Sequence, residues 1–205
     1  MNIIDPEAIE RESMKIISKI IGSLDCSLEE EKIIKRVIHA TAAPEFTELV
    51  VISHDAVEKA LNLFKQEVGL VTDVNMLKAG ISKKKLEELN LTVDCLIARD
   101  DIIQKAKKRG ITRSMMSMRE AVKDENNKIF IIGNAPTALF ELINLLEEGK
   151  AEHVELIIGT PVGFVGASES KEELKKIDLP FITVTGRRGG SPVAASIINA
   201  LLYMT

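Results

Sequence analysis

The sequence predicts an α/β fold of three layers, in which a mainly parallel, doubly wound β-sheet lies between two layers of helices. Short apolar segments alternate along the chain with longer segments that have the apolar periodicity of amphipathic helices. The short segments are almost continuously apolar, which indicates strands buried on both faces, as in parallel sheets. Right-handed crossover connections between such strands produce the doubly wound arrangement. The 205 residues contain no linker, repeat or low-complexity tract, so we expect a single domain over residues 1–205.

Two helices are expected before the first strand. Asp5 and Pro6 suit the N-cap and first position of a helix, and Ser27 with Glu30 can form a capping box for a second one. The strands that we expect are residues 47–53, 70–74, 92–97, 128–133, a segment running from 153 into a glycine-rich loop, and 181–186. The helices that we expect are residues 54–69 with Ser53 as N-cap and Gly69 at the end, a short helix ending near 89 after a loop at Gly80, 98–110, 114–122, 134–149, 170–177 and 191–202.

The composition excludes several classes of protein. A net charge of −4 disfavours a general binder of nucleic acids or anionic membranes, and 3% aromatic residues without any Trp disfavour base stacking. No apolar run reaches membrane-spanning length, and the N-terminal segment lacks the pattern of a signal peptide. Cys26 and Cys95 form no disulfide framework or metal cluster, and we interpret them as buried thiols in a reducing compartment. We therefore expect a cytoplasmic protein without a metal site of its own, a membrane or a nucleic-acid partner.

Three glycine-containing segments follow predicted strands: residues 133–139, 159–171 and 186–192. Ligands of doubly wound proteins bind beyond the carboxyl ends of the strands, where loops meet helix N-termini. We expect exposed backbone N–H groups in these segments to bind an anion, and such groups suit a carboxylate as well as a phosphate. A nucleotide is disfavoured, because the first strand leads into residues 53–55 without a G-x-G-x-x-G pattern. The 159–171 segment resembles a phosphate-binding P-loop only in composition.

Several single residues are candidates for chemistry, each with a structural alternative. His39 lies near the end of the second predicted helix and is either a structural residue or a proton donor or acceptor near neutral pH. Arg36, three residues earlier on the same helix face, is either a carboxylate clamp or an ordinary solvated charge. Arg113, Arg187 and Arg188 leave the same two interpretations open. None of these residues identifies a reaction by itself.

Four segments together identify a family. KRVIHAT at 35–41, GNAPTAL at 133–139, GTPVGFVGASESK at 159–171 and GRRGGSPVAASIINAL at 186–201 strongly resemble the precorrin-8X methylmutase family, which includes the cobalt-precorrin-8 methylmutases. The resemblance covers nearly the whole chain in the family's order and spacing, including ESMKII near the start and GITRS in the middle.

The resemblance implies an intramolecular methyl shift on ring C of a corrin precursor in cobalamin (vitamin B12) biosynthesis, giving hydrogenobyrinate or cobyrinate. It implies a homodimer of flavodoxin-like subunits, with this tetrapyrrole substrate near the subunit interface. No cofactor is expected, because the reaction is a rearrangement, and cobalt, when present, is carried by the substrate. His39 corresponds to the family's catalytic histidine, a general acid. The substrate contacts that we expect are Ser13, Arg36, Thr112, Arg113, Asn134, Arg187 and Arg188.

Three other functions remain to be weighed against the methylmutase. A non-catalytic flavodoxin-like protein would bind a nucleotide, a flavin or a tetrapyrrole. A methyltransferase would need a glycine-rich adenosylmethionine loop after an early strand, which residues 47–58 do not supply. A scaffold protein would leave the arginine-rich loop and His39 without a purpose.

Overall fold

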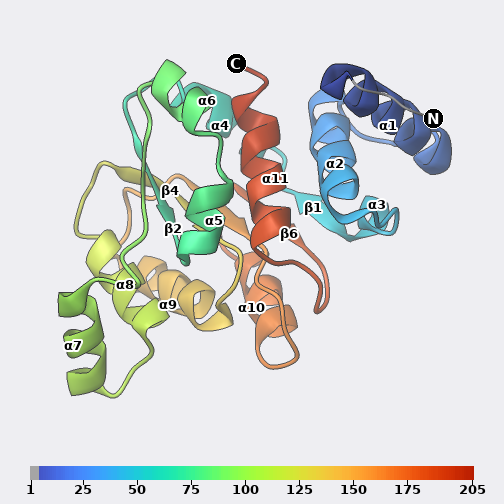
Figure 1. Ribbon diagram of the computed structural model, residues 1–205. Coiled ribbons are helices and arrows are strands. Elements are labelled where there is room, and N and C mark those ends of the chain that lie inside the picture. The colour runs from blue at the N-terminus through green and yellow to red at the C-terminus, as the bar shows by residue number, and fades with distance from the viewer. Residues whose placement is uncertain (1–4) are drawn as a thin grey trace.

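A six-stranded β-sheet crosses the molecule, with its strands in the order β1-β6-β5-β4-β2-β3 (Figure 1). The computed structural model describes residues 5–205. The strands are β1 (Val50–Ile52), β2 (Gly69–Thr72), β3 (Thr92–Asp94), β4 (Asn127–Ile132), β5 (Leu156–Gly159) and β6 (Phe181–Val184). All neighbouring strands are parallel except β1, which is antiparallel to β6 at one edge. Counted without β1, the strands have the flavodoxin-like order 2-1-3-4-5, so the predicted fold class is confirmed.

Helices cover both faces of the sheet. They are α1 (Pro6–Ile21), α2 (Leu28–Thr41), α3 (Phe46–Leu49), α4 (Ala56–Leu63), α5 (Asn75–Gly80), α6 (Lys83–Glu88), α7 (Asp100–Arg109), α8 (Arg113–Ala121), α9 (Pro136–Glu147), α10 (Ala167–Leu174) and α11 (Ser191–Leu202). Ile129 and Ile131 of β4 pack into a core with α2, α4, α5, α6 and α11, whereas Phe130 and Ile132 pack into a second core with α7 to α10. Helix α1 lies outside α2 (Figure 1). No helix within residues 5–205 has both the length and the apolarity to cross a membrane.

The predicted starts of the first two helices are confirmed. The side chain of Asp5 accepts a hydrogen bond from the backbone N–H of Glu7, and Pro6 occupies the first turn of α1. The Ser27 hydroxyl accepts from the Glu30 N–H while the Glu30 carboxylate accepts from the Ser27 N–H, which completes the capping box of α2.

The predicted strand 47–53 is only partly correct. Residues 46–49 form the helical turn α3, because the Phe46 side chain is buried and the Thr47 hydroxyl donates to the Pro44 carbonyl. Ser53 is not the N-cap of the next helix, as predicted. Its hydroxyl accepts from the Phe181 N–H at 2.8 Å, so its hydrogen bond goes to the sheet edge, and Asp55 precedes α4 instead.

Two predicted roles of glycine are wrong. Gly69 does not end a helix: α4 ends at Leu63, and Gly69 begins β2. A Cβ on Gly69 would lie 2.4 Å from Asn127 Oδ1 in the adjoining strand. Gly80 is the last residue of α5 rather than part of a loop, and it packs against Ala195. In both places a close tertiary approach explains the glycine, which local sequence rules assign to a helix end or a loop.

Other differences concern strand lengths and one cysteine. Strands β3 and β5 are shorter than the predicted segments. Cys95 is buried as expected, whereas Cys26 is exposed in the loop between α1 and α2.

Candidate active site

Three loops at the carboxyl edge of the sheet pack against one another. We name residues 133–137, 159–166 and 186–191 the loop cluster. A Cβ on Gly133 would lie 2.9 Å from the Cα of Ser191, and a Cβ on Gly189 would lie 2.2 Å from the carbonyl oxygen of Thr160. The Gly190 N–H donates to that same carbonyl oxygen at 2.8 Å. The φ angles of Gly189 (146°) and Gly190 (112°) lie in the region that favours glycine, so this close packing depends on both glycines.

The first loop of the cluster is held by a carboxylate of the chain itself. Asp73, fully buried just after β2, accepts hydrogen bonds from the N–H groups of Gly133 (3.0 Å), Asn134 (2.9 Å) and Ala135 (2.7 Å). Strands β2 and β4 adjoin where the strand order reverses, which is the usual ligand position in this fold. The prediction that N–H groups of residues 133–135 are exposed to bind a ligand anion is therefore wrong. Burial raises the pKa of the Asp73 carboxyl and outweighs the three N–H groups, which lower it.

The third loop carries the two predicted arginines on its exposed side. The Arg187 guanidinium lies 5.7 Å from the ring centre of Phe164, which is 85% exposed. Arg188 forms an ion pair with Glu45 at 2.5 Å. Because Glu45 follows α2 closely in the chain, this ion pair connects the loop cluster to the end of the helix that bears His39.

A groove of about 460 Å³ lies between α1, α2 and α11. Arg36 lines it and pairs with Glu10 of α1 at 2.7 Å. The other lining residues are Ala40, Pro192, Ala195, Ser196, Asn199 and Tyr203. His39 is exposed in the last turn of α2, next to Ala40, and Pro192 directly follows the loop cluster. The groove thus extends from the predicted arginine of α2 to the N-terminal end of α11.

The remaining predicted substrate contacts differ in whether they are connected to the loop cluster. Thr112 caps α8 and donates to the Thr137 hydroxyl at 3.3 Å, which connects the start of α8 to the loop cluster. Arg113 is exposed and has no ion pair within residues 5–205, and the Asn134 side chain is also exposed. The Ser13 hydroxyl donates to the Ile9 carbonyl of its own helix at 2.9 Å. Thus Thr112 is hydrogen-bonded to the loop cluster, and Asn134, Arg187 and Arg188 lie on it, whereas Ser13 and His39 form no side-chain hydrogen bond or ion pair with it within residues 5–205.

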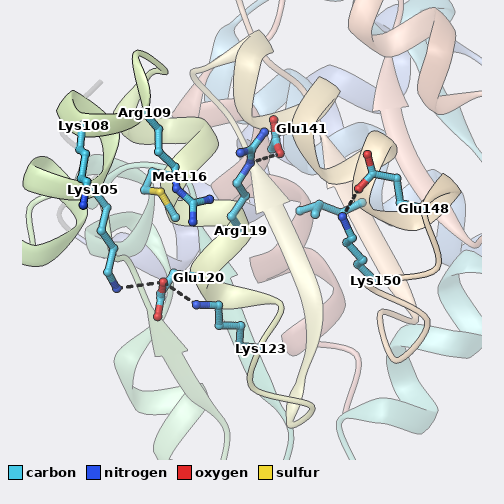
Figure 2. Close-up of a pocket in the computed structure, with 11 residues that line it drawn as sticks. Lys105, Lys108, Arg109, Met116, Arg119, Glu120, Lys123, Glu141, Glu148 and Lys150 are labelled. Carbon is cyan, nitrogen blue, oxygen red and sulfur yellow. Dashed lines mark hydrogen bonds and ion pairs between the residues drawn. The ribbon is translucent and has the colours of Figure 1, made fainter.

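A larger cavity lies elsewhere, among α7, α8 and α9, with a volume of about 740 Å³ (Figure 2). Helix α9 follows β4, so its C-terminal half runs back towards the amino edge of the sheet, away from the loop cluster. Figure 2 shows that the charged side chains lining this cavity largely pair with one another. Glu120 binds Lys105 and Lys123, Arg119 binds Glu141, and Lys150 binds Glu148. Cations there also compensate the negative C-terminal ends of the helices, so we do not assign the active site to this cavity.

Two residues that matter to the site were not among the predicted candidates. Asp73 is an acidic residue that directly follows an apolar strand at the switch point, and that position is the one signal the sequence offered. Lys171 is fully buried on α10 and donates to the Arg188 carbonyl at 2.6 Å. Nothing in the lysine-rich segment 170–177 distinguishes it from its neighbours.

Within residues 5–205, no three His, Cys, Asp or Glu side chains lie close enough to hold a metal ion.

The fold and the loop cluster define an α/β protein of flavodoxin-like topology whose switch point is occupied by its own carboxylate and whose carboxyl edge carries exposed arginines. This class differs from nucleotide-binding proteins of the same topology, in which loop N–H groups at this edge hold a phosphate. The model of the precorrin-8X methylmutase family matches residues 8–204, and the chain belongs to this family.

Relatives with curated names agree with this assignment. The cobalt-precorrin-8 methylmutase of Priestia megaterium is 40% identical over 97% of this chain and 88% of that protein. That of Salmonella typhimurium is 41% identical over 97% of this chain and 95% of that protein. The precorrin-8X methylmutase of Pseudomonas aeruginosa is 34% identical over 96% of this chain and 95% of that protein. The solved structure of the Thermus thermophilus precorrin-8X methylmutase has a TM-score of 0.88 at 31% identity, and the match covers 97% of this chain and 95% of that one.

Proposed function

We propose that this protein is the isomerase that moves a methyl group between adjacent carbons of ring C of precorrin-8X or cobalt-precorrin-8 in cobalamin biosynthesis. The observation that carries the proposal is the meeting of the family's loop motifs in one surface, tied to the end of α2 by the Arg188–Glu45 ion pair. The occupied switch point argues against the alternative of a nucleotide-binding protein, because Asp73 already takes the N–H groups that a phosphate would need.

The chemistry of the substrate class suits this surface. A corrin precursor is a flat macrocycle fringed with carboxylates, so it requires apolar contacts together with several separated cations. Phe164 and Val165 are strongly exposed beside Arg187 and offer an apolar surface. Arg36 and Arg188 are paired with Glu10 and Glu45, and substrate carboxylates would replace those glutamates.

We propose that His39 is the general acid. The rearrangement moves one methyl group within the molecule, so no atom enters or leaves and no redox or group-carrying cofactor is required. Protonation of the ring system favours the product, and one histidine suffices to supply that proton and to accept one back as the product forms, so that no net proton is consumed. The exposure of His39, next to Ala40 at the groove, leaves its imidazole accessible to a bound ligand.

The test compares two exposed histidines. His39→Ala should fold normally and bind the macrocycle but lose turnover, whereas His54→Ala should retain wild-type turnover because His54 lies before α4 and outside the groove. The visible spectrum follows conversion after incubation with precorrin-8X and, separately, with cobalt-precorrin-8. Turnover retained by His39→Ala would remove His39 as the acid. No spectral change with either substrate, together with tight binding of a flavin or nucleotide, would favour the non-catalytic alternative.

We propose cobalt-precorrin-8 as the natural substrate. Relatives that are 40%, 43% and 41% identical are named for the cobalt form, whereas two named for the metal-free form are each 34% identical. The metal would be held by the macrocycle. A higher kcat/KM with the metal-free substrate would contradict this choice.

We also propose a homodimer that uses an exposed stripe on α1. Ile9, Ile16 and Ile20 are 46%, 50% and 58% exposed, and their spacing places them on one helix face with Ser13. A second copy covering this stripe would bring Ser13 to the subunit interface. Ile16→Glu should convert a dimer to a monomer in size-exclusion chromatography, while Lys15→Glu should not. A monomeric wild-type protein would refute this assignment.

A cytoplasmic location remains a prediction.

A further inference from the structure

Lys171 is a buried cation without a carboxylate partner. Its side chain is fully buried on α10, and within residues 5–205 no carboxylate oxygen lies within 4 Å of its Nζ atom. Among the described residues, its one hydrogen-bond acceptor is the carbonyl oxygen of Arg188, at 2.6 Å. Burying an ammonium group with a single neutral acceptor is unfavourable, so stability of the fold does not account for this lysine.

The acceptor belongs to the loop that carries the exposed arginines. This loop is fixed from several sides: the Gly163 N–H donates to the Arg187 carbonyl at 3.2 Å, and Gly189 and Gly190 pack against the Thr160 carbonyl. Lys171 adds a contact from α10 to the residue between these two fixed points. The Arg188 carbonyl is therefore turned inward, towards α10, while the guanidinium of the same residue reaches Glu45 on the outer side.

We propose that Lys171 is a positioning residue, whose ammonium group holds the Arg188 carbonyl and thereby sets Arg187 and Arg188 to bind carboxylates of the substrate. This inference rests on the proposed role of these two arginines in substrate binding. The buried charge also acts directly, because a cation beneath the loop attracts the anionic substrate with little screening by solvent.

The charge of Lys171 changes within an accessible pH range. Burial, with a smaller contribution from Lys175, lowers the pKa of Lys171 from 10.5 to about 8, while Glu172 opposes the shift. The loop that Lys171 contacts also carries Arg187 and Arg188, and the Arg188 guanidinium is paired with Glu45. Lys171 thus loses its charge progressively as the pH rises through about 8. Substrate affinity should therefore decline as the pH rises through 8.

The test is steady-state kinetics of the full-length protein with cobalt-precorrin-8 between pH 7 and 9, for wild type, Lys171→Met and the control Lys175→Met. Lys175, the C-cap residue of α10, is partly exposed and its side chain pairs with Glu172, so its replacement removes one positive charge from the same helix without removing a hydrogen bond to the loop. In Lys171→Met we expect KM at pH 7 to rise about tenfold with kcat nearly unchanged, as for the loss of a charge-assisted hydrogen bond. Wild type should show KM rising above pH 8. Lys175→Met should show the same rise displaced to slightly higher pH, because Lys175 helps to lower the pKa of Lys171. Lys171→Met should lack that rise.

A purely structural role would give a different result. It predicts a lower melting temperature without any change in the pH dependence of KM. We instead expect the melting temperature of Lys171→Met to be retained, because an apolar side chain of similar length replaces a buried charge. A wild-type KM that is constant from pH 7 to 9, or equal KM values in wild type and Lys171→Met, would overturn the inference while leaving the isomerase activity in place. A wild-type protein without turnover would overturn both.

Discussion

The buried carboxylate of Asp73 offers the most direct test of how the loop cluster is held. Asp73→Asn keeps the shape of the side chain but replaces one accepting oxygen with an NH₂ group. In the native protein one oxygen accepts from Gly133 and the other accepts from Asn134 and Ala135. Whichever orientation the new amide takes, at least one backbone N–H group faces a donor instead of an acceptor.

The magnitude follows from three contributions. A buried, unsatisfied N–H group costs about 1–3 kcal/mol. The remaining hydrogen bonds lose their charge assistance, for a further loss of about 1 kcal/mol. Relief from burying a charge, indicated by the raised pKa of Asp73, offsets part of this sum. We expect a net loss of about 2 kcal/mol, which lowers the melting temperature of a chain of this size by about 4–8 °C.

Thermal unfolding and amide hydrogen exchange together provide the assay. The amides of Gly133, Asn134 and Ala135 should exchange faster in the variant. Asp94→Asn is the control, because Asp94 accepts from the Cys95 N–H at 2.7 Å but has a side chain that is 60% exposed, so its loss should cost less than about 1 kcal/mol. An Asp73→Asn protein as stable as wild type, with the three amides equally protected, would refute the reasoning.

Three further substitutions test other parts of the structure. Gly189→Ala places a Cβ 2.2 Å from the Thr160 carbonyl oxygen in a backbone conformation with φ of 146°. We therefore expect the loop to be displaced, the free energy of unfolding to fall by about 1–3 kcal/mol and the corrin product to bind more weakly in a spectroscopic titration. Unchanged affinity would contradict this. Glu141→Gln removes the charge of the almost fully buried partner of Arg119 and should cost about 1–3 kcal/mol in urea unfolding. An unchanged free energy of unfolding would show that the charge of Glu141 does not contribute to stability. Ser27→Ala breaks the capping box of α2 and should cost about 1 kcal/mol, and an unchanged unfolding midpoint would show that the cap contributes nothing.

The fold was predictable because its signals are local. The strands of the parallel sheet are nearly continuous apolar runs, and β4 shows why: Ile129 and Ile131 face one core, and Phe130 and Ile132 face the other. Both faces of such a strand require apolar residues, which is the pattern that the sequence displays. Element ends were less predictable, because tertiary hydrogen bonds compete with local rules. Ser53, a good helix cap by type, has its hydroxyl bound instead to the sheet edge at Phe181.

The candidate site was predictable only in part. Its motif residues could be named from the family resemblance, and several of them meet in the loop cluster. Their charged partners could not be named, since each lies far away in the sequence: Asp73 binds an amide 60 residues later, and Arg188 binds Glu45. Lys171 shows the same limit, because burial alone separates it from Lys175, and burial is a property of the packed chain.

The two glutamates paired with the arginines have a consequence for selectivity. Glu10 and Glu45 are attached to the same chain as Arg36 and Arg188, so each competes with any incoming anion at a high effective concentration. An anion with one charge exchanges one ion pair for another and gains little. A rigid ligand with many carboxylates displaces both glutamates, and its second displacement occurs within a complex that has already formed. We expect this surface to select ligands by their valence, which sets a polycarboxylate macrocycle apart from the more abundant simple anions of a cell.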